Sequence, residues 1–382
     1  MEYDEKVSAL ALKIAFPYKP VLVRALISAA GGAAKLFGMD SCERSSLFLS
    51  QDLAGVLPAS FTDPCKEENL EKASVECEWC EKSGIEVIGY HEPEFPRRVL
   101  ECADAPVILF KYGNAELNPE RSVSIVGTRR ATEYGRYSTT GIVSEISEKI
   151  PNTLIVSGLA FGTDINAHKC ALELGVPTVA ILPGALNNIY PSSHRGIASK
   201  ISKNGALLSD FTRGSESYKI NFISRNRIIA SMSDVTIIPE SGIRGGGLIT
   251  ARLAHSYGRE IFAVPGRLTD LLSEGCNSLI SENVANVYTG IGDILRVMNW
   301  ESKSGNGAQL SFYHNIERAE KQKILVSLSS ERELSFERLA ILTGLKPGEL
   351  AATLTELELE GYVIGFAGNR YRINVLKNES LR

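Results

Sequence analysis

The sequence predicts an α/β protein in which helices cover both faces of a parallel sheet, with a small helical module before the sheet and a winged helix after it. From Arg121 to about Val297, a short apolar strand, a glycine-containing loop and a helix recur about every 25 to 30 residues, which is typical of a parallel sheet. Each expected strand is continuously apolar, as strands covered on both faces must be. Beyond Trp300, three helical patterns and a hairpin follow one another in the order of a winged helix.

Apolar residues at helical spacing characterise the first 75 or so residues. The expected helices span residues 8–15, 21–29 and 33–37, and we assign them to an N-terminal module over residues 1–75. The Gly31-Gly32 turn could present backbone N–H groups to a phosphate, or could simply form a corner between two helices. Strands near residues 85–88 and 106–110 then lead into the sheet.

The sheet domain is expected over residues 80–300, followed by a polar, Gly- and Ser-containing linker over residues 301–317. Its strands are predicted at residues 122–126, 154–156, 178–182, 206–208, 235–238 and 260–264. The winged helix is expected over residues 318–376, with helices at residues 319–328, 335–342 and 347–360 and a hairpin formed by residues 362–366 and 371–373.

Composition places the chain among ordinary soluble proteins, with 382 residues, 44% of them hydrophobic and 23% charged. No window approaches the roughly 18 apolar residues that a membrane span needs, and the first residues do not form a signal peptide. We therefore expect a cytoplasmic protein with no membrane contact. The seven cysteines fit reduced thiols. Cys77 and Cys80 lack two further ligands at similar spacing, so we expect no metal site.

The net charge of -4 argues at first against a nucleic-acid partner. It is an average, however, and between Pro119 and Trp300 there are 18 Lys and Arg against 15 Asp and Glu, a net charge of +3. The rest of the chain carries -7. Any binding of DNA must therefore come from a local pocket in the central domain.

Ligands of open parallel sheets bind beyond the carboxyl ends of the strands, where loops and helix N-termini converge. Loops expected at that edge are rich in small residues, which either let a phosphate approach backbone N–H groups or simply make tight turns. They include Gly127-Thr128-Arg129, Ser157-Gly158 and Gly245-Gly246-Gly247. The first loop matches neither a dinucleotide nor a Walker fingerprint, and we expect no cofactor.

The densest chemical cluster is Lys219-Ile220-Asn221-Phe222-Ile223-Ser224-Arg225-Asn226-Arg227, at the start of an expected helix. Basic side chains interleaved with an aromatic suit a single-stranded nucleic acid, because the cations follow the backbone while the ring stacks on a base. Alternatively, Phe222 belongs to the core and the arginines pair with carboxylates.

Nucleophilic catalysis has little support in the sequence. Ser157, His168 and His194 could be assembled on paper, but no Gly-x-Ser-x-Gly elbow exists. Asp164 fits the N-cap of a helix, and His168 is expected to be structural. We expect no catalytic residue.

Six motifs follow one another along the chain. They are Ile125-Val126-Gly127-Thr128-Arg129, residues 157–164 with Ala167-His168, Tyr190-Pro191, Phe222 with residues 225–230, Leu248-Ile249-Thr250-Ala251 and Ala263-Val264-Pro265-Gly266. Their order and spacing resemble those of the DNA-processing protein A (DprA, or Smf) family. The chain resembles the family strongly over residues 85–297. The resemblance implies an extended Rossmann-like, doubly wound fold that binds and protects single-stranded DNA and helps load the RecA recombinase during natural transformation. It also implies a homodimer formed through the central domain, with the helix at residues 248–257 and the strand after it as candidate surfaces.

The resemblance further implies roles for individual residues. Arg129 resembles the family's pocket arginine, and Lys219 and Phe222 resemble its backbone-binding lysine and base-stacking aromatic. Arg225 and Arg227 would line the same basic pocket. The complete expected set of nucleic-acid-binding residues is Gly127, Thr128, Arg129, Ser157, Gly158, Lys219, Phe222, Arg225, Asn226, Arg227, Gly246 and Gly247. The sequence departs from the family pattern where Ile243-Arg244 follows Ser241-Gly242, and where Ile223 replaces the usual proline.

The winged helix is expected to be a poor reader of duplex DNA. Its third helix carries Glu349, Glu356, Glu358 and Glu360 and no basic residue after Lys346, whereas a helix in the major groove needs basic or amide side chains. Only Arg370 and Arg372 in the wing remain as possible phosphate contacts. We expect the module to contact a protein, or the central domain, instead.

The alternative function is that of a nucleotide-processing Rossmann enzyme of the lonely-guy phosphoribohydrolase type, which the layout also resembles. The signature of those enzymes is Pro-Gly-Gly-x-Gly-Thr followed by a catalytic Glu. Here Gly245-Gly246-Gly247 lacks the proline, and residues 251–254 supply no carboxylate. We therefore expect a DNA-binding protein rather than an enzyme.

Overall fold

The computed structural model describes residues 4–53, 55–215, 218–300, 319–330, 334–366 and 369–373. The chain divides into two compact units, Met1–Asp293 and Ile294–Arg382, which are described separately. The linker expected over residues 301–317 lies outside the described residues.

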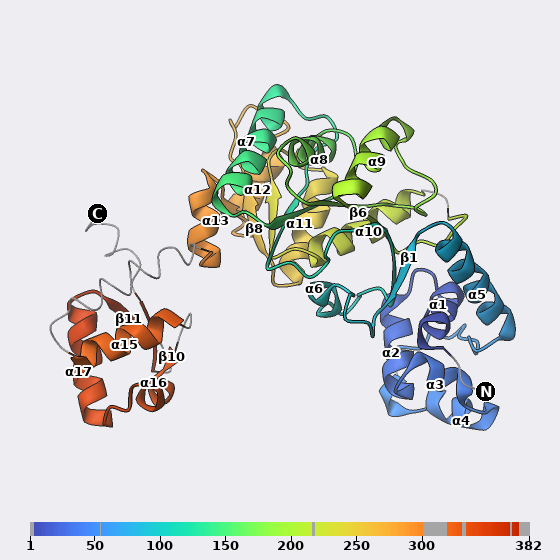
Figure 1. Cartoon of the computed structure of the whole chain (residues 1–382), viewed down its shortest axis with the longest axis horizontal. Helices are drawn as coiled ribbons and strands as arrows, with labels where there is room; N and C mark the ends of the chain where they lie inside the picture. Colours follow the sequence, from blue (N-terminus) through green and yellow to red (C-terminus); the bar gives the residue numbers. More distant parts are fainter. Residues whose placement is uncertain are drawn as a thin grey trace. The chain divides into compact units, whose positions relative to one another are not determined.

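The larger unit is built on a nine-stranded sheet with the order β1-β2-β6-β5-β4-β3-β7-β8-β9 (Figure 1). The strands are β1 (Glu86–Gly89), β2 (Ile108–Gly113), β3 (Arg121–Ile125), β4 (Thr153–Ser157), β5 (Thr178–Ile181), β6 (Gly205–Ser209), β7 (Val235–Ile238), β8 (Glu260–Ala263) and β9 (Asn286–Val287). All six predicted parallel strands are present, with ends that differ by no more than one residue. The short edge strand β9 was not predicted.

The sheet is mixed rather than purely parallel, because β2 runs antiparallel to both of its neighbours, β1 and β6. This direction brings the end of β2 to the edge of the sheet at which β3 begins. A short connection of residues 114–120 can then reach β3 without a crossover helix, which a parallel arrangement would need.

Helices cover both faces of the sheet (Figure 1). One face carries α7 (Glu133–Lys149), α8 (Thr163–Glu173) and α9 (Arg195–Asn204), and the other carries α10 (Lys219–Ser231), α11 (Gly246–Ser256) and α12 (Glu274–Ser281). From β3 the chain proceeds strand by strand to β6, and α10 then carries it back to β7, on the other side of β3. The order of the strands therefore reverses between β3 and β7, where open sheets bind ligands. The helix α13 (Ile291–Met298) follows β9.

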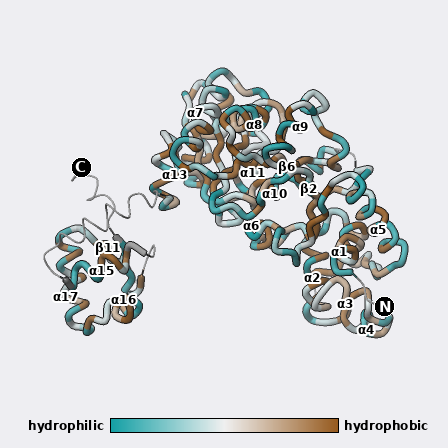
Figure 2. The backbone as a smooth tube through the Cα atoms, viewed as in Figure 1, coloured by the Kyte–Doolittle hydropathy of each residue, from teal (hydrophilic) through white to brown (hydrophobic). Residues whose placement is uncertain are grey.

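The N-terminal helices share a core with the sheet. They are α1 (Glu5–Ala15), α2 (Pro20–Ala30), α3 (Ala33–Gly38), α4 (Ser41–Phe48), η1 (Gln51–Leu53) and α5 (Glu67–Lys82). Leu10 and Leu26 belong to the same buried cluster as Ile108 of β2 and Leu207 of β6. Figure 2 shows hydrophobic residues along the strands and more hydrophilic ones on outer helices such as α5. The boundary expected between residues 75 and 80 falls inside α5.

The Gly31-Gly32 turn is a corner between helices. The Glu5 carboxylate accepts hydrogen bonds from the backbone N–H groups of Ala33 (2.7 Å) and Ala34 (2.8 Å). It therefore occupies the place at the start of α3 that a phosphate would take.

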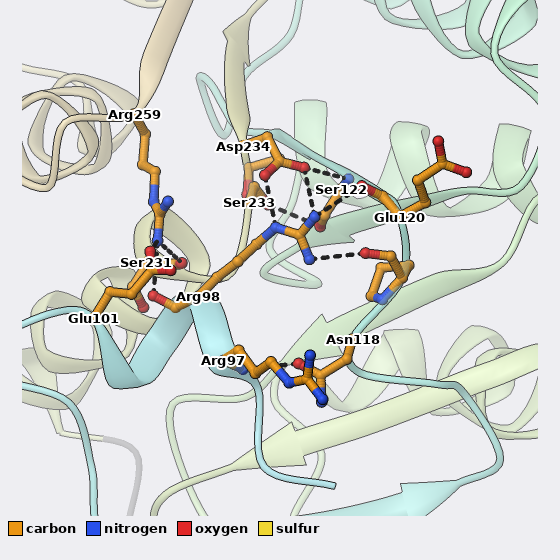
Figure 3. Close-up of polar contacts among 12 residues, drawn as sticks. Arg97, Arg98, Glu101, Asn118, Glu120, Ser122, Ser231, Ser233, Asp234 and Arg259 are labelled. Carbon is orange, nitrogen blue, oxygen red and sulfur yellow. Dashed lines mark hydrogen bonds and ion pairs between the residues drawn. The ribbon is translucent and has the colours of Figure 1, made fainter. Parts of the chain in front are cut away.

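Arg98 of α6 (Arg97–Leu100) ties the segment before β3 to the amino edge of the sheet (Figure 3). Its guanidinium pairs with the Asp234 carboxylate at 2.7 Å and donates to the Pro119 carbonyl at 2.9 Å. Asp234 in turn accepts from the backbone N–H of Ser122 at 2.9 Å. This network lies at the opposite edge from the strand ends where ligands bind, so we interpret it as structural.

The smaller unit has the winged-helix fold that the sequence predicts. It contains α15 (Ala319–Ser330), β10 (Leu334–Ser335), α16 (Phe336–Thr343), α17 (Pro347–Leu359), β11 (Val363–Phe366) and β12 (Arg370–Ile373), and the strand order is β10-β12-β11. Ile324, Leu339 and Leu354 lie in its separate core. Lys321 pairs with Glu356 at 3.1 Å and with Glu360 at 2.5 Å, so two of the glutamates near the end of α17 bind within the unit.

Candidate functional site

The loops that follow β3, β4 and β7 meet at the carboxyl edge of the sheet, and glycines allow them to touch. A Cβ at Gly127 would lie 2.5 Å from Thr163 Oγ1 and 2.6 Å from the Glu240 carbonyl oxygen. A Cβ at Gly247, in the first turn of α11, would lie 3.0 Å from the Gly127 Cα. Gly162 has a φ of 76° and precedes α8. These contacts bring the starts of α8 and α11 to one crevice.

The two carboxylates of this crevice are occupied by structural hydrogen bonds. Glu240 accepts from the backbone N–H of Thr132 at 2.8 Å and from its hydroxyl at 2.5 Å. Asp164 accepts from the Ala160 N–H at 3.3 Å. Burial raises the pKa of the Asp164 carboxyl, and the nearby Arg225 and Arg129 oppose this shift. The prediction that Asp164 is the N-cap of α8 is wrong, because Gly162 occupies that position.

Arg129, Phe222 and Tyr190 form the accessible part of the crevice. The Arg129 guanidinium carbon lies 4.8 Å from the centre of the Phe222 ring. The Tyr190 ring approaches Phe222 edge-on, with 5.5 Å between ring centres and an angle of 79° between the ring planes. Arg129 is exposed, Phe222 is half-buried and Tyr190 is 45% exposed. The group therefore offers a cation and two aromatic rings to solvent.

Lys219 and Asn226 continue this accessible surface along α10. Lys219 is the first residue of the helix and is exposed, and Asn226 is half-buried. Residues three and four apart lie on one face of a helix, so Lys219, Phe222 and Asn226 share a face. No ion pair involves Lys219 within the described part of the chain.

Arg225 lies in the interior and is not part of the accessible pocket. It is 3% exposed, and its guanidinium donates to the carbonyl oxygens of Gly158 (2.6 Å) and Ile181 (2.5 Å). Burial lowers the pKa of Arg225 to about 10, so the side chain stays charged at neutral pH. It joins the ends of β4 and β5 to α10, and it is not exposed for a phosphate.

Arg227 is also buried, at 8% exposure, and pairs with the Asp210 carboxylate. It donates in addition to the Asp104 carbonyl oxygen. The expectation that Arg225 and Arg227 line the basic pocket therefore disagrees with their burial. The alternative, that the arginines pair with carboxylates, describes Arg227, whereas the partners of Arg225 are backbone carbonyls. Both side chains lie on the buried side of α10, which also carries Ile228 and Ile229.

The remaining predicted residues have buried side chains or are glycines, so they shape the crevice rather than offer it side-chain groups. Ser157 is fully buried and donates its hydroxyl to the Ile125 carbonyl at 2.6 Å. Thr128 is buried, and its N–H donates to the Glu240 carbonyl at 2.8 Å. Gly158 leaves the space that the Arg225 guanidinium fills. Gly246 is the first residue of α11, and the space at its Cβ position is free. A ligand in the crevice can therefore approach the N-terminus of this helix.

The histidines near the crevice are structural. His168 is fully buried, and its Nδ1 lies 2.8 Å from the Thr178 hydroxyl. That hydroxyl donates its proton to the Ile155 carbonyl, so Nδ1 is the donor in the first bond. Burial lowers the pKa of His168 to about 3, and the neighbouring Arg225 adds to this effect. The side chain is therefore neutral at neutral pH.

Two aromatic contributions were not predicted. Tyr190 was expected only as part of the Tyr190-Pro191 motif, and Phe161, which is 47% exposed and packs edge-on against His194 at 4.8 Å, was given no role. Phe161 and Tyr190 lie in the segments that follow β4 and β5, at the same edge of the sheet as Gly127. This position after a strand end could have identified them from the sequence.

No cluster of three or more His, Cys, Asp or Glu side chains in the described ranges could hold a metal ion. Within the same ranges, no helix combines the length and the apolar character that a membrane crossing requires.

Comparison with known proteins agrees with the resemblance. The family model for DNA recombination-mediator protein A matches residues 86–299, and the model for the DprA winged helix domain matches residues 316–369. The chain is 36% identical over 196 residues to the DNA processing protein DprA of Streptococcus pneumoniae, which covers 51% of this chain and 68% of that protein. It is 29% identical over 300 residues to the Protein Smf of Escherichia coli, which covers 77% of this chain and 79% of the relative.

Two solved structures are similar to the fold. The X-ray structure of DprA from Streptococcus pneumoniae matches 78% of this chain and 98% of its own, with a TM-score of 0.63 and 26% identity. A structure that describes the single-stranded DNA binding mode of DprA from Helicobacter pylori matches 56% of this chain and 95% of its own, with a TM-score of 0.51 and 30% identity.

Proposed function

This chain belongs to the DprA/Smf family of DNA-processing proteins, and we propose that it binds single-stranded DNA in the crevice between β3 and β7. The observation that carries the proposal is the exposed group of Arg129, Phe222 and Tyr190. In this role Phe222 stacks on a base, and Arg129 and Lys219 contact the adjacent phosphates.

The geometry favours an unpaired strand over a duplex. An aromatic face accepts a base only when the base is unstacked from its neighbours, and a single strand can present such a base without breaking base pairs. Each such stack contributes roughly 1–3 kcal/mol and tolerates any base. The half-burial of Phe222 limits the motion of its ring, which lowers the entropy lost when a base stacks on it.

The crevice offers little to the alternative function of a phosphoribohydrolase. Its two carboxylates, Asp164 and Glu240, are buried and hydrogen-bonded to backbone groups. A general acid or base must reach its substrate to transfer a proton. We therefore infer a binding role rather than a catalytic one.

We further propose a homodimer formed through the central domain, and delivery of the bound strand to the RecA recombinase in natural transformation. The strand suggested as a dimer surface, β8, pairs with both β7 and β9, so edge pairing by β8 is not available. Exposed Ile243, Ile249 and Leu271 at the carboxyl edge support a packed interface instead. A monomer in sedimentation velocity at micromolar concentration would contradict the dimer, and unchanged RecA strand exchange would contradict the delivery role.

The test of the DNA-binding proposal is a salt titration of affinity for single-stranded and duplex oligonucleotides. Arg129→Ala and Lys219→Ala should each lower single-strand affinity and reduce the salt slope by roughly 0.7, the value for one phosphate contact on a single strand. Phe222→Ala should lower affinity roughly tenfold or more with little change of slope, because stacking releases no ions.

Matched controls come from exposed positions outside the crevice. Arg97→Ala in α6, and Lys149→Ala and Tyr137→Ala beyond the first turn of α7, remove an arginine, a lysine and an aromatic side chain and should change affinity by less than about twofold. Equal losses in the control variants would argue against the pocket. Absence of single-strand binding by the wild-type chain, or turnover of nucleoside monophosphates to free base, would overturn the proposal.

A further inference from the structure

A basic groove runs between α8 and α9, outside the crevice described above. It has a volume of about 260 Å³ and is lined on one side by Lys169 and Glu173 of α8 and on the other by Lys200 and Lys203 of α9. The three lysines are exposed, and none forms an ion pair with another described residue. With Glu173 as the one carboxylate in the lining, the groove has two excess positive charges.

The floor of the groove is apolar. Leu172 and Ile197 line it from the two helices, and both are half-buried. A basic rim above an apolar floor suits a nucleic-acid strand, because phosphates can meet the ammonium groups while sugars and base edges contact the floor. An acidic protein segment would use the rim in the same way, but it would not need this floor.

The two helices that form the groove both begin at the crevice. The helix α8 starts at Thr163, whose N–H donates to the Thr128 carbonyl at 3.1 Å, next to Arg129. The helix α9 starts shortly after Tyr190, and its first residue, Arg195, is exposed. The residues that line the groove lie further along these helices, from Lys169 on α8 and from Ile197 on α9. Figure 1 shows the two helices side by side on one face of the sheet.

The spacing along the helices sets the distance between the lysines and the crevice. Lys169 lies six residues after Thr163, and Lys200 and Lys203 lie five and eight residues after Arg195. At a rise of 1.5 Å per residue, these residues sit roughly 8–12 Å along their helices from the crevice. A strand held by one stacked base in the crevice could reach them with its next few nucleotides.

We propose that the groove between α8 and α9 is a second contact for the same single strand, in which Lys169, Lys200 and Lys203 bind the phosphates of nucleotides leaving the crevice. This inference rests on the proposed function. It predicts that affinity depends on strand length, because short oligonucleotides fill only the crevice whereas longer ones also enter the groove.

The test compares oligothymidylates of about 4 and about 15 nucleotides, a range that brackets single-strand site sizes, by fluorescence anisotropy with the full chain. The variant Lys169→Gln/Lys200→Gln/Lys203→Gln should bind the longer strand roughly tenfold more weakly, since each exposed charge contributes modestly. Its salt slope for the longer strand should fall by about 2, for three phosphate contacts. Binding of the shorter strand should change by less than about twofold.

Two further variants make the test specific. Lys35→Gln/Lys66→Gln/Lys149→Gln removes the same charge from other elements and should leave both affinities nearly unchanged. Glu173→Gln should raise affinity for the longer strand only, because it removes a charge that repels phosphates. A gain of affinity also cannot arise from misfolding.

The outcomes separate this inference from the proposed function. Suppose that Arg129→Ala weakens binding of both oligonucleotides while the groove variant changes the affinity for neither. The proposed crevice site is then supported and the groove proposal is wrong, which leaves an acidic protein as the partner of the three lysines. Equal losses in the groove and control variants would also overturn it. If the wild-type chain binds neither strand, both proposals fail.

Discussion

At the crevice, the Arg225 guanidinium packs closely against Gly158. Arg225 fills the space where a Cβ at Gly158 would lie, and it donates to the carbonyl of that same residue. Its second bond goes to the Ile181 carbonyl at 2.5 Å. One buried cation therefore holds two strand ends and α10 together, and any side chain at residue 158 would have to displace the Arg225 guanidinium.

Gly158→Ala should lower the free energy of unfolding of the larger unit by about 3 kcal/mol, because the methyl group displaces a buried, hydrogen-bonded charge. Urea unfolding measures the loss. Gly141→Ala, in α7, is the matched control, since a Cβ there meets nothing within 4 Å, and it should be neutral or slightly stabilising. In the double variant Gly158→Ala/Arg225→Met the two losses should be less than additive. Additive losses would mean that the two residues do not depend on each other.

Arg225 also shows the limit of sequence reasoning at this scale. A run of Lys, Phe and Arg predicts nucleic-acid binding from residue types, and two of its members, Lys219 and Phe222, are accessible in the structure. It cannot show that the carbonyls of Gly158 and Ile181 converge on the second cation of the run, Arg225. These acceptors lie 67 and 44 residues away, so only the folded sheet reveals them.

Among the elements, α10 depends on a contact from the N-terminal helices. The Tyr18 hydroxyl donates to Asn221 Oδ1 at 2.9 Å, and the Tyr18 ring lies 6.4 Å from that of Phe211. Asn221 is fully buried in the first turn of α10, between Lys219 and Phe222. The N-cap residue of α10 makes no capping bond through its side chain. We infer that Tyr18 helps fix the turn that carries the proposed binding residues.

Tyr18→Phe should therefore lower single-strand affinity about two- to fivefold, because one hydrogen bond contributes about 1 kcal/mol. The salt slope should stay the same, since no phosphate contact is lost. Hydrogen exchange of the amides in the first turn of α10 should become faster. Tyr137→Phe, at an exposed position on α7, serves as the control. Unchanged exchange and affinity in Tyr18→Phe would show that α10 holds its first turn without this bond.

The elements differ in how far the sequence specifies them. The six central strands were predictable because burial on both faces makes them continuously apolar. The edge strand β9 was not, since it has two residues and both are exposed. The direction of β2 depends on where β3 must start, which is a property of the sheet and not of the local pattern. The core that the N-terminal helices share with β2 is likewise formed by residues far apart in the sequence. A domain boundary drawn from composition therefore could not reveal it.

Across the whole molecule, net charge is distributed unevenly, and we expect the positively charged part to bind DNA and the negatively charged parts not to. The central segment carries +3, and the rest of the chain carries -7. The winged-helix unit has its own core, and its third helix, α17, is acidic from Glu349 onward. Exposed carboxylates repel phosphates, so this unit should add nothing to the affinity for DNA.

A chain that ends at residue 300 should consequently bind single-stranded and duplex DNA with affinities and salt slopes within about twofold of those of the full chain. Anisotropy titrations at several salt concentrations measure both quantities, and the complementary fragment of residues 301–382 should show no duplex binding at physiological salt. The full-length variant Arg370→Ala/Arg372→Ala serves as the comparison for the wing. A tenfold loss of single-strand affinity on truncation, matched by that variant, would show that the wing contacts phosphates. Unchanged DNA binding together with lost stimulation of RecA would instead assign this unit to a protein partner, because the acidic surface that repels DNA can attract a basic one.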